Sequence, residues 1–69
     1  MTITAEISFM VFGQNGAGHI EKRVIEMDIQ DYTACTDSNR EKNAALKSWA
    51  KSMFPTAKDV KIQTARKTQ

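Results

Sequence analysis

Three glycines within six positions follow an apolar run and could form a loop that binds phosphate. They are Gly13, Gly16 and Gly18, and the chain has no others. Their order is not that of a dinucleotide fingerprint, and no Gly-Lys-Ser/Thr of a nucleotide P-loop follows them. The residues after Gly18 have the pattern of a strand, so no helix N-terminus is offered to an anion. Asn15 followed by Gly16 instead predicts a tight β-hairpin turn.

Cys35 and His19 are the residue types of a thiol nucleophile and its base, and the chain has one of each. His19 falls beside the predicted turn and Cys35 in a predicted loop, and this spacing gives no reason for contact between them. We therefore interpret Cys35 as a partly buried loop residue. Glu26 and Asp28 share one face of a predicted strand, but no apolar pocket around them is implied, so a solvated outer face explains them.

We expect no catalytic, cofactor-binding or metal-binding residue, and so no enzyme. One cysteine and one histidine cannot supply the four ligands of a structural zinc site. The single cysteine also excludes an internal disulfide. Stability must then come from packing or from self-association.

Positive charge is concentrated in the second half of the chain. The net charge is +2, but residues 1–31 carry five acidic and two basic side chains, a net of −3, whereas residues 32–69 carry three acidic and eight basic ones, a net of +5. Such a surface can bind phosphates, although a basic stripe also solvates an ordinary helix and no aromatic residue interleaves with these cations. The candidate nucleic-acid contacts are Arg40, Lys47, Lys51, Lys58, Arg66 and Lys67. Lys61 belongs to the same basic part of the sequence.

Length and composition indicate one small globular domain over residues 1–69. The chain has 69 residues, of which 41% are hydrophobic and 26% charged. A domain of this size buries only about 60% of the surface that its unfolded chain exposes. The first residues carry no basic side chain, and the apolar runs are too short for a signal core or a membrane span. We expect a soluble, cytoplasmic protein without a membrane partner.

Two-residue alternation predicts three strands. Residues 3–12 place Ile, Ala, Ile, Phe and Val on one face, and residues 19–29 and 59–65 alternate in the same way. The first half of the second strand is more polar, which suggests a bulge near Arg23 and Val24. Residues 66–69 are expected to form a flexible tail.

One amphipathic helix is predicted from about residue 39 to Met53. Ser38 and Glu41 form a capping-box pattern at its start, with Asp37 as the competing cap, after a polar loop over residues 31–39. Pro55 ends the helix. Trp49 falls on the apolar face, where it is expected to pack on Phe9 and Ile7 as the largest core residue.

The order strand, strand, helix, strand predicts a two-layer α+β domain, with one helix on one face of a three-stranded sheet. Two strand orders satisfy the connections. We favour 2-1-3, because it makes every neighbouring pair antiparallel and centres the strand that is most apolar on both faces.

That order leaves large apolar side chains on the face away from the helix, and grouped apolar side chains often mark a contact surface. The two edge strands also expose unpaired backbone N–H and C=O groups to which another strand can bond, and lysine and arginine side chains protect these edges only partly. We therefore predict a non-enzymatic interaction or assembly module, a homodimer formed through the free sheet face or an edge strand. The alternative is a small basic nucleic-acid-binding protein. The predicted interface residues are Met10, Phe12, Ile20 and Val24.

Overall fold

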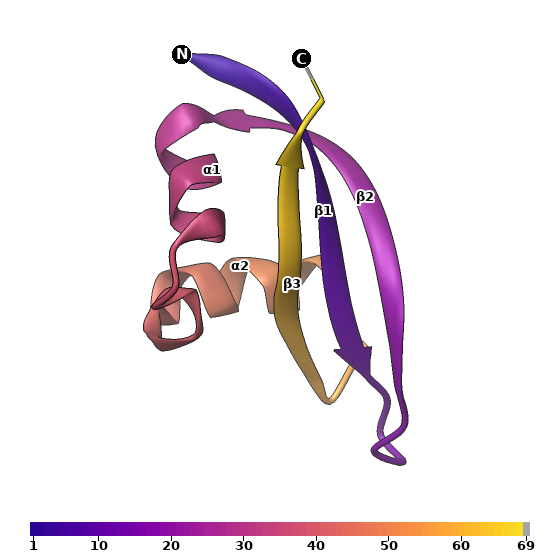
Figure 1. Ribbon diagram of the computed structural model, residues 1–69. Coiled ribbons are helices and arrows are strands. Elements are labelled where there is room, and N and C mark those ends of the chain that lie inside the picture. The colour runs from indigo at the N-terminus through magenta and orange to yellow at the C-terminus, as the bar shows by residue number, and fades with distance from the viewer. Residues whose placement is uncertain (69) are drawn as a thin grey trace.

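The computed structural model describes residues 1–68 and shows two helices on one side of a three-stranded sheet (Figure 1). The strands are β1 (Thr2–Phe12), β2 (Gly18–Asp28) and β3 (Asp59–Lys67). The helical segments are α1 (Ile29–Thr36), a 3-10 turn η1 (Arg40–Lys42) and α2 (Ala44–Met53). None of these helices is long and apolar enough to cross a membrane.

The sheet is antiparallel with the order β2-β1-β3, which confirms the predicted fold class and strand order. The hairpin turns at Gly16, whose φ of 85° lies in the left-handed region that glycine adopts without strain. Its register is continuous from Thr2 opposite Asp28 to Phe12 opposite Gly18. The bulge predicted in β2 is therefore wrong, and the irregularity lies between β1 and β3, at Ser8 and Phe9.

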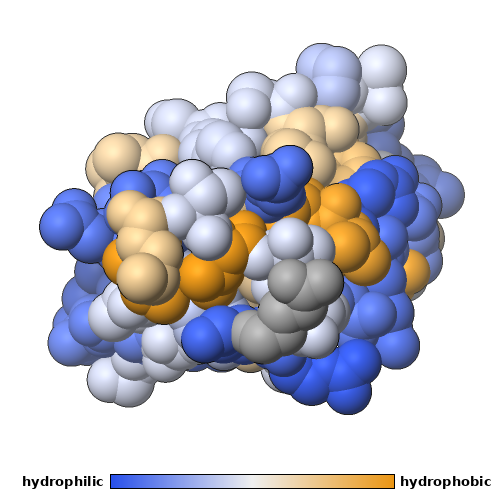
Figure 2. All heavy atoms as spheres, turned by 90° about the horizontal axis from the view of Figure 1, so that it is seen from above, coloured by the Kyte–Doolittle hydropathy of each residue, from blue (hydrophilic) through white to orange (hydrophobic). Residues whose placement is uncertain are grey.

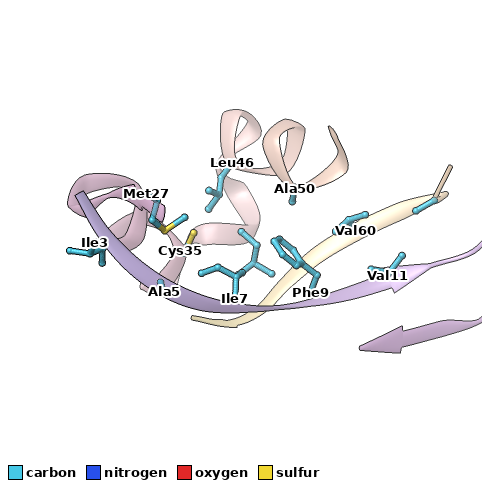
Figure 3. Packing of buried hydrophobic residues seen from close by; sticks show 12 residues of the cluster. Ile3, Ala5, Ile7, Phe9, Val11, Met27, Cys35, Leu46, Ala50 and Val60 are labelled. Atoms are coloured by element: carbon cyan, nitrogen blue, oxygen red, sulfur yellow. The ribbon is translucent and has the colours of Figure 1, made fainter. Parts of the chain in front are cut away.

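The core lies between β1 and the two helices (Figure 3). The inward side chains of β1 are the alternate residues that the sequence pattern indicated, and Phe9 and Ile7 are fully buried. Trp49 packs on Phe9 with ring centroids 5.7 Å apart, and Phe54 meets the same ring edge-on at 5.3 Å. Aromatic pairs favour such tilted geometries. The predicted contact of Trp49 with Phe9 is confirmed, but Trp49 is only partly buried, and the largest fully buried side chain is Phe9.

Residues 29–36 form a helix, where the sequence pattern predicted the end of a strand and a loop. Asp28 caps α1 by accepting a hydrogen bond from the Gln30 N–H over 2.9 Å. Cys35 consequently lies inside this helix and is buried at 1% exposure, not in a loop. Two helices, rather than one, therefore cover the sheet.

The predicted capping box at Ser38 is also wrong. The α2 helix starts later, and its cap is Asn43, whose side-chain oxygen accepts from the Leu46 N–H over 3.0 Å. The end of the helix is as predicted, since the Phe54 N–H closes it on the Lys51 carbonyl just before Pro55.

The strand β3 extends into residues 66–69, which were predicted to form a flexible tail. Arg66 and Lys67 belong to β3, and the Thr68 N–H donates to the Thr4 carbonyl over 3.0 Å. Gln69, the last residue of that predicted tail, lies outside the described residues. Seen from the end where both termini lie, apolar side chains form a central band between hydrophilic residues (Figure 2).

Candidate functional site

The two edge strands of the sheet differ in how well they are covered. In β2 only Met27 is buried, and Val24 and Ile20 are exposed at 65% and 45%. In β3, Val60 and Ile62 are buried. The helices contact β3 more extensively than β2, so both faces of β2 are open along much of its length.

Side chains occupy the outer edge of β3. The Arg40 guanidinium donates from Nε to the Ile62 carbonyl over 3.1 Å and from Nη2 to the Gln63 carbonyl over 3.0 Å. The Tyr32 hydroxyl accepts from the Lys67 N–H over 3.1 Å. Three of the backbone groups that would pair with a further strand are thus already bonded, which makes this edge a poorer template for strand addition.

The β2 edge has much less of this protection. The Gly13 N–H bonds to the Ala17 carbonyl at one end of the hairpin, and the Ile29 N–H bonds to the Met1 carbonyl at the other. Because bonding pairs alternate in an antiparallel ladder, the odd-numbered residues of β2 bond to β1. The even-numbered residues direct their N–H and C=O groups outward. Within residues 1–68, the contact made to this outward row is from the Arg23 guanidinium to the Lys22 carbonyl, at 3.0 Å.

The four residues predicted to form an interface share the open face of the sheet, because Met10 is opposite Ile20 and Val24 is opposite Glu6. They do not form a continuous apolar patch. Lys22 lies between Ile20 and Val24 on β2, and it is exposed.

Further charges interrupt the β1 part of that face. Glu6 is paired with Arg66 at 3.3 Å, and the Lys61 ammonium lies 5.9 Å from the centre of the Phe12 ring. Met10 and Phe12 are partly buried among these neighbours. The strongly exposed apolar residues of the face are therefore those of β2.

A small polar cluster occupies the helix side of β2 near the hairpin. The Glu21 carboxylate is bonded to the Arg23 guanidinium and to the His19 ring, each at 3.1 Å, and the guanidinium lies 5.1 Å from the Phe54 ring centre. The Arg23 hydrogen bond, and then that of His19, lower the pKa of Glu21. The stabilisation is present above the ordinary pKa of a glutamate and is lost as the pH falls through the lowered one.

Cys35 and His19 are not brought together. Cys35 is buried in α1, beside Met27 (Figure 3), while His19 is exposed next to the hairpin turn and bonds to Glu21. Burial raises the pKa of the Cys35 thiol, and the Asp31 carboxylate adds to this. Within residues 1–68, no three side chains of His, Cys, Asp or Glu are grouped to hold a metal ion.

The predicted nucleic-acid contacts are dispersed. Arg40 is half-buried against β3, and Arg66 is paired with Glu6. Lys47 and Lys42 line a groove of about 280 Å³ between α2 and β3, above a floor that includes Leu46 and Ile62. The Lys61 ammonium lies instead on the opposite face of the sheet, beside Phe12. Lys51 instead lies on another part of α2, with its ammonium 3.5 Å from the Pro55 carbonyl. The remaining members, Lys58 and Lys67, lie next to and within β3.

Sequence reasoning missed the residues that make the two edges unequal. Tyr32 was given no role, and Arg40 was predicted to face a nucleic acid. Their contacts with β3 join residues 22 to 35 positions apart in the sequence, which no local pattern encodes. The exposed polar half of β2 was the one available signal, since a strand whose inner face carries His19, Glu21 and Arg23 cannot be well covered.

Comparisons of the chain with protein-family models, with curated proteins and with solved structures gave no match.

Proposed function

We propose that this protein is a non-enzymatic assembly module that self-associates through the edge of its sheet formed by β2. The supporting observation is the inequality of the two edges: Arg40 and Tyr32 bond three outward backbone groups of β3, whereas in the outward row of β2 the Lys22 carbonyl alone has such a contact within residues 1–68. An unpaired, exposed strand edge is a template for another strand. A second copy of the chain offers the same edge, so pairing requires no other protein.

Edge pairing suits this surface better than stacking of two open faces. Stacking would remove Lys22, Lys61 and the Glu6–Arg66 pair from water, and burying charges without full compensation is costly. Edge pairing leaves these groups at the surface. It still brings Ile20 and Val24 beside apolar atoms of the second copy.

The small size of the domain gives a reason for association. A short chain buries a small fraction of its surface, and the inner face of β2 borders a groove of about 320 Å³ lined by Ile25, Leu46 and Trp49. A second sheet placed beside β2 would narrow that groove. Folding and association would then stabilise each other.

Light scattering behind a size-exclusion column tests the proposal. We expect a species of twice 7.8 kDa at micromolar concentration. Val24→Pro should convert it to a monomer, because the Val24 N–H faces outward and its loss leaves the β1 ladder intact. Met10→Glu, on the open face away from that edge, is the matched control and should leave the size unchanged. A wild-type monomer at these concentrations would refute the proposal, and dissociation by Met10→Glu but not by Val24→Pro would assign the interface to the face.

Nucleic-acid binding is the second candidate, and the groove lined by Lys42 and Lys47 favours it. Phosphate binding by these cations would weaken steeply with salt. Fluorescence anisotropy with labelled DNA and RNA at low salt measures it directly. Lack of binding, or an affinity that Lys42→Glu with Lys47→Glu leaves unchanged, would exclude this function.

A further inference from the structure

The outward row of β2 carries opposite charges placed symmetrically about one residue. The row runs from Gly18 to Asp28, and its central members are Ile20, Lys22, Val24 and Glu26, whose side chains lie on the open face of the sheet. Lys22 and Glu26 are each two positions from Val24. Both are exposed, and neither takes part in the ion pairs found within residues 1–68.

We propose that two copies pair their β2 strands antiparallel about a two-fold axis at Val24, so that Val24 faces itself and Lys22 faces Glu26 of the second copy. This inference rests on the proposed function and specifies the register in which the two β2 strands pair. The outward backbone groups of residues 22, 24 and 26 would form about six hydrogen bonds, two for each bonded pair. Two sheets of three strands would become one continuous sheet.

Charge complementarity selects this register among its neighbours. A two-fold axis at Lys22 or at Glu26 would place like charges opposite each other, which destabilises a strand pair. An axis at Arg23 would do the same on the helix side of the sheet. At Val24 the axis instead gives two cross-strand ion pairs and an apolar contact at the centre.

An axis at Ile25 is the remaining competitor. It would place Lys22 opposite Asp28 of the second copy, but the Asp28 carboxylate already caps α1 and lies 3.5 Å from the terminal ammonium. It would also set Val24 against Glu26 near the centre of the pairing, whereas the axis at Val24 sets Ile20 against Asp28 only at its ends. Glu26 makes no such bonds within its own chain, so the register at Val24 uses an available carboxylate.

Association exchanges one contact at the edge. The Arg23 guanidinium now donates to the Lys22 carbonyl, the group that would accept from the Glu26 N–H of the second copy. That guanidinium also bonds to Glu21 and lies over the Phe54 ring. It can therefore release the carbonyl and keep its other partners.

Two charge reversals that restore each other test the register. Lys22→Glu alone, and Glu26→Lys alone, each turn both ion pairs into like-charge pairs and should weaken self-association by about tenfold or more. An equimolar mixture of the two variants should associate as tightly as the wild type, because the mixed dimer has opposite charges at both positions. Sedimentation equilibrium at low salt measures all three affinities.

A symmetric cross-link gives an independent test. Residues of a bonded antiparallel pair have Cα atoms about 5.5 Å apart, within the range that a disulfide spans. In a Cys35→Ala background, Val24→Cys with a mild oxidant should give a covalent dimer. Lys22→Cys is the matched control and should not, because each Lys22 lies four strand positions from its symmetry mate.

The outcomes separate this inference from the function on which it rests. A wild-type monomer refutes both. A wild-type dimer that Val24→Pro dissociates, but whose reversed-charge variants fail to restore each other and whose Val24→Cys form does not cross-link, retains the edge and refutes the register. Restoration in the mixture together with the cross-link supports both.

Discussion

The surroundings of Cys35 reduce the reactivity of its thiol. Its thiol is enclosed between α1 and the sheet, and its pKa is raised by burial and by Asp31, with Arg40 acting in the opposite direction. A raised pKa lowers the thiolate fraction at a given pH, and the thiolate is the reactive form. The residue therefore behaves as a small apolar core group.

We expect Cys35 to react slowly with a thiol reagent such as dithionitrobenzoate in native buffer at pH 8. Reaction should require opening of α1 from the sheet, so its rate should rise steeply with urea. The control is the rate at which the same reagent reacts with Cys35 in the fully unfolded protein. A native rate close to that of the unfolded chain would contradict the buried position.

Among the structural elements, the hairpin and the end of α2 were accessible from sequence, whereas the starts of the helices were not. Asn15-Gly16 and Pro55 act through their own backbone restrictions, so their effects are local. The N-cap of α2 is set by where tertiary packing makes the helix begin. Ser38 matches the capping-box motif better, but the helix begins at Ala44, so Asn43 is the residue at the N-cap position.

Asn43→Ala should reduce the free energy of unfolding by about 1 kcal/mol, because the Leu46 N–H loses its partner at the start of α2. Ser38→Ala should change it by less than about 0.5 kcal/mol, since Ser38 does not cap a helix. Urea titrations followed by Trp49 fluorescence, at one fixed protein concentration, compare the two variants. A larger effect of Ser38→Ala would reinstate the capping box.

For the whole molecule, the two-layer arrangement and the strand order followed from hydrophobic periodicity and from the direction of the connections. The pairs that close β3 did not, because they join a helix or turn to a strand far along the chain. Polar side chains carry no periodic signal for such contacts. The pattern placed Met10, Phe12, Ile20 and Val24 on one shared face of the sheet, as the register shows, but the inequality of the two edges emerged from tertiary contacts.

Removing the Arg40 guanidinium should open the second edge. Arg40→Ala frees the carbonyls of Ile62 and Gln63, and a molecule with two available edges can add copies on both sides. We expect species larger than the wild-type assembly in light scattering, with a size that grows with concentration. Lys42→Ala, in the same 3-10 turn and exposed, is the control and should match the wild type. An Arg40→Ala protein that is folded and unchanged in size would show that Arg40 does not limit growth.

If self-association proceeds through β2 as proposed, the contacts of Arg40 and Tyr32 along β3 would make the molecule monovalent for sheet extension. A copy that joins a row of strands through β2 turns its occupied side toward the solvent and ends that row. Growth by the proposed route would stop at two copies, and the assembly would remain a finite particle at concentrations where a bivalent sheet would polymerise into fibres.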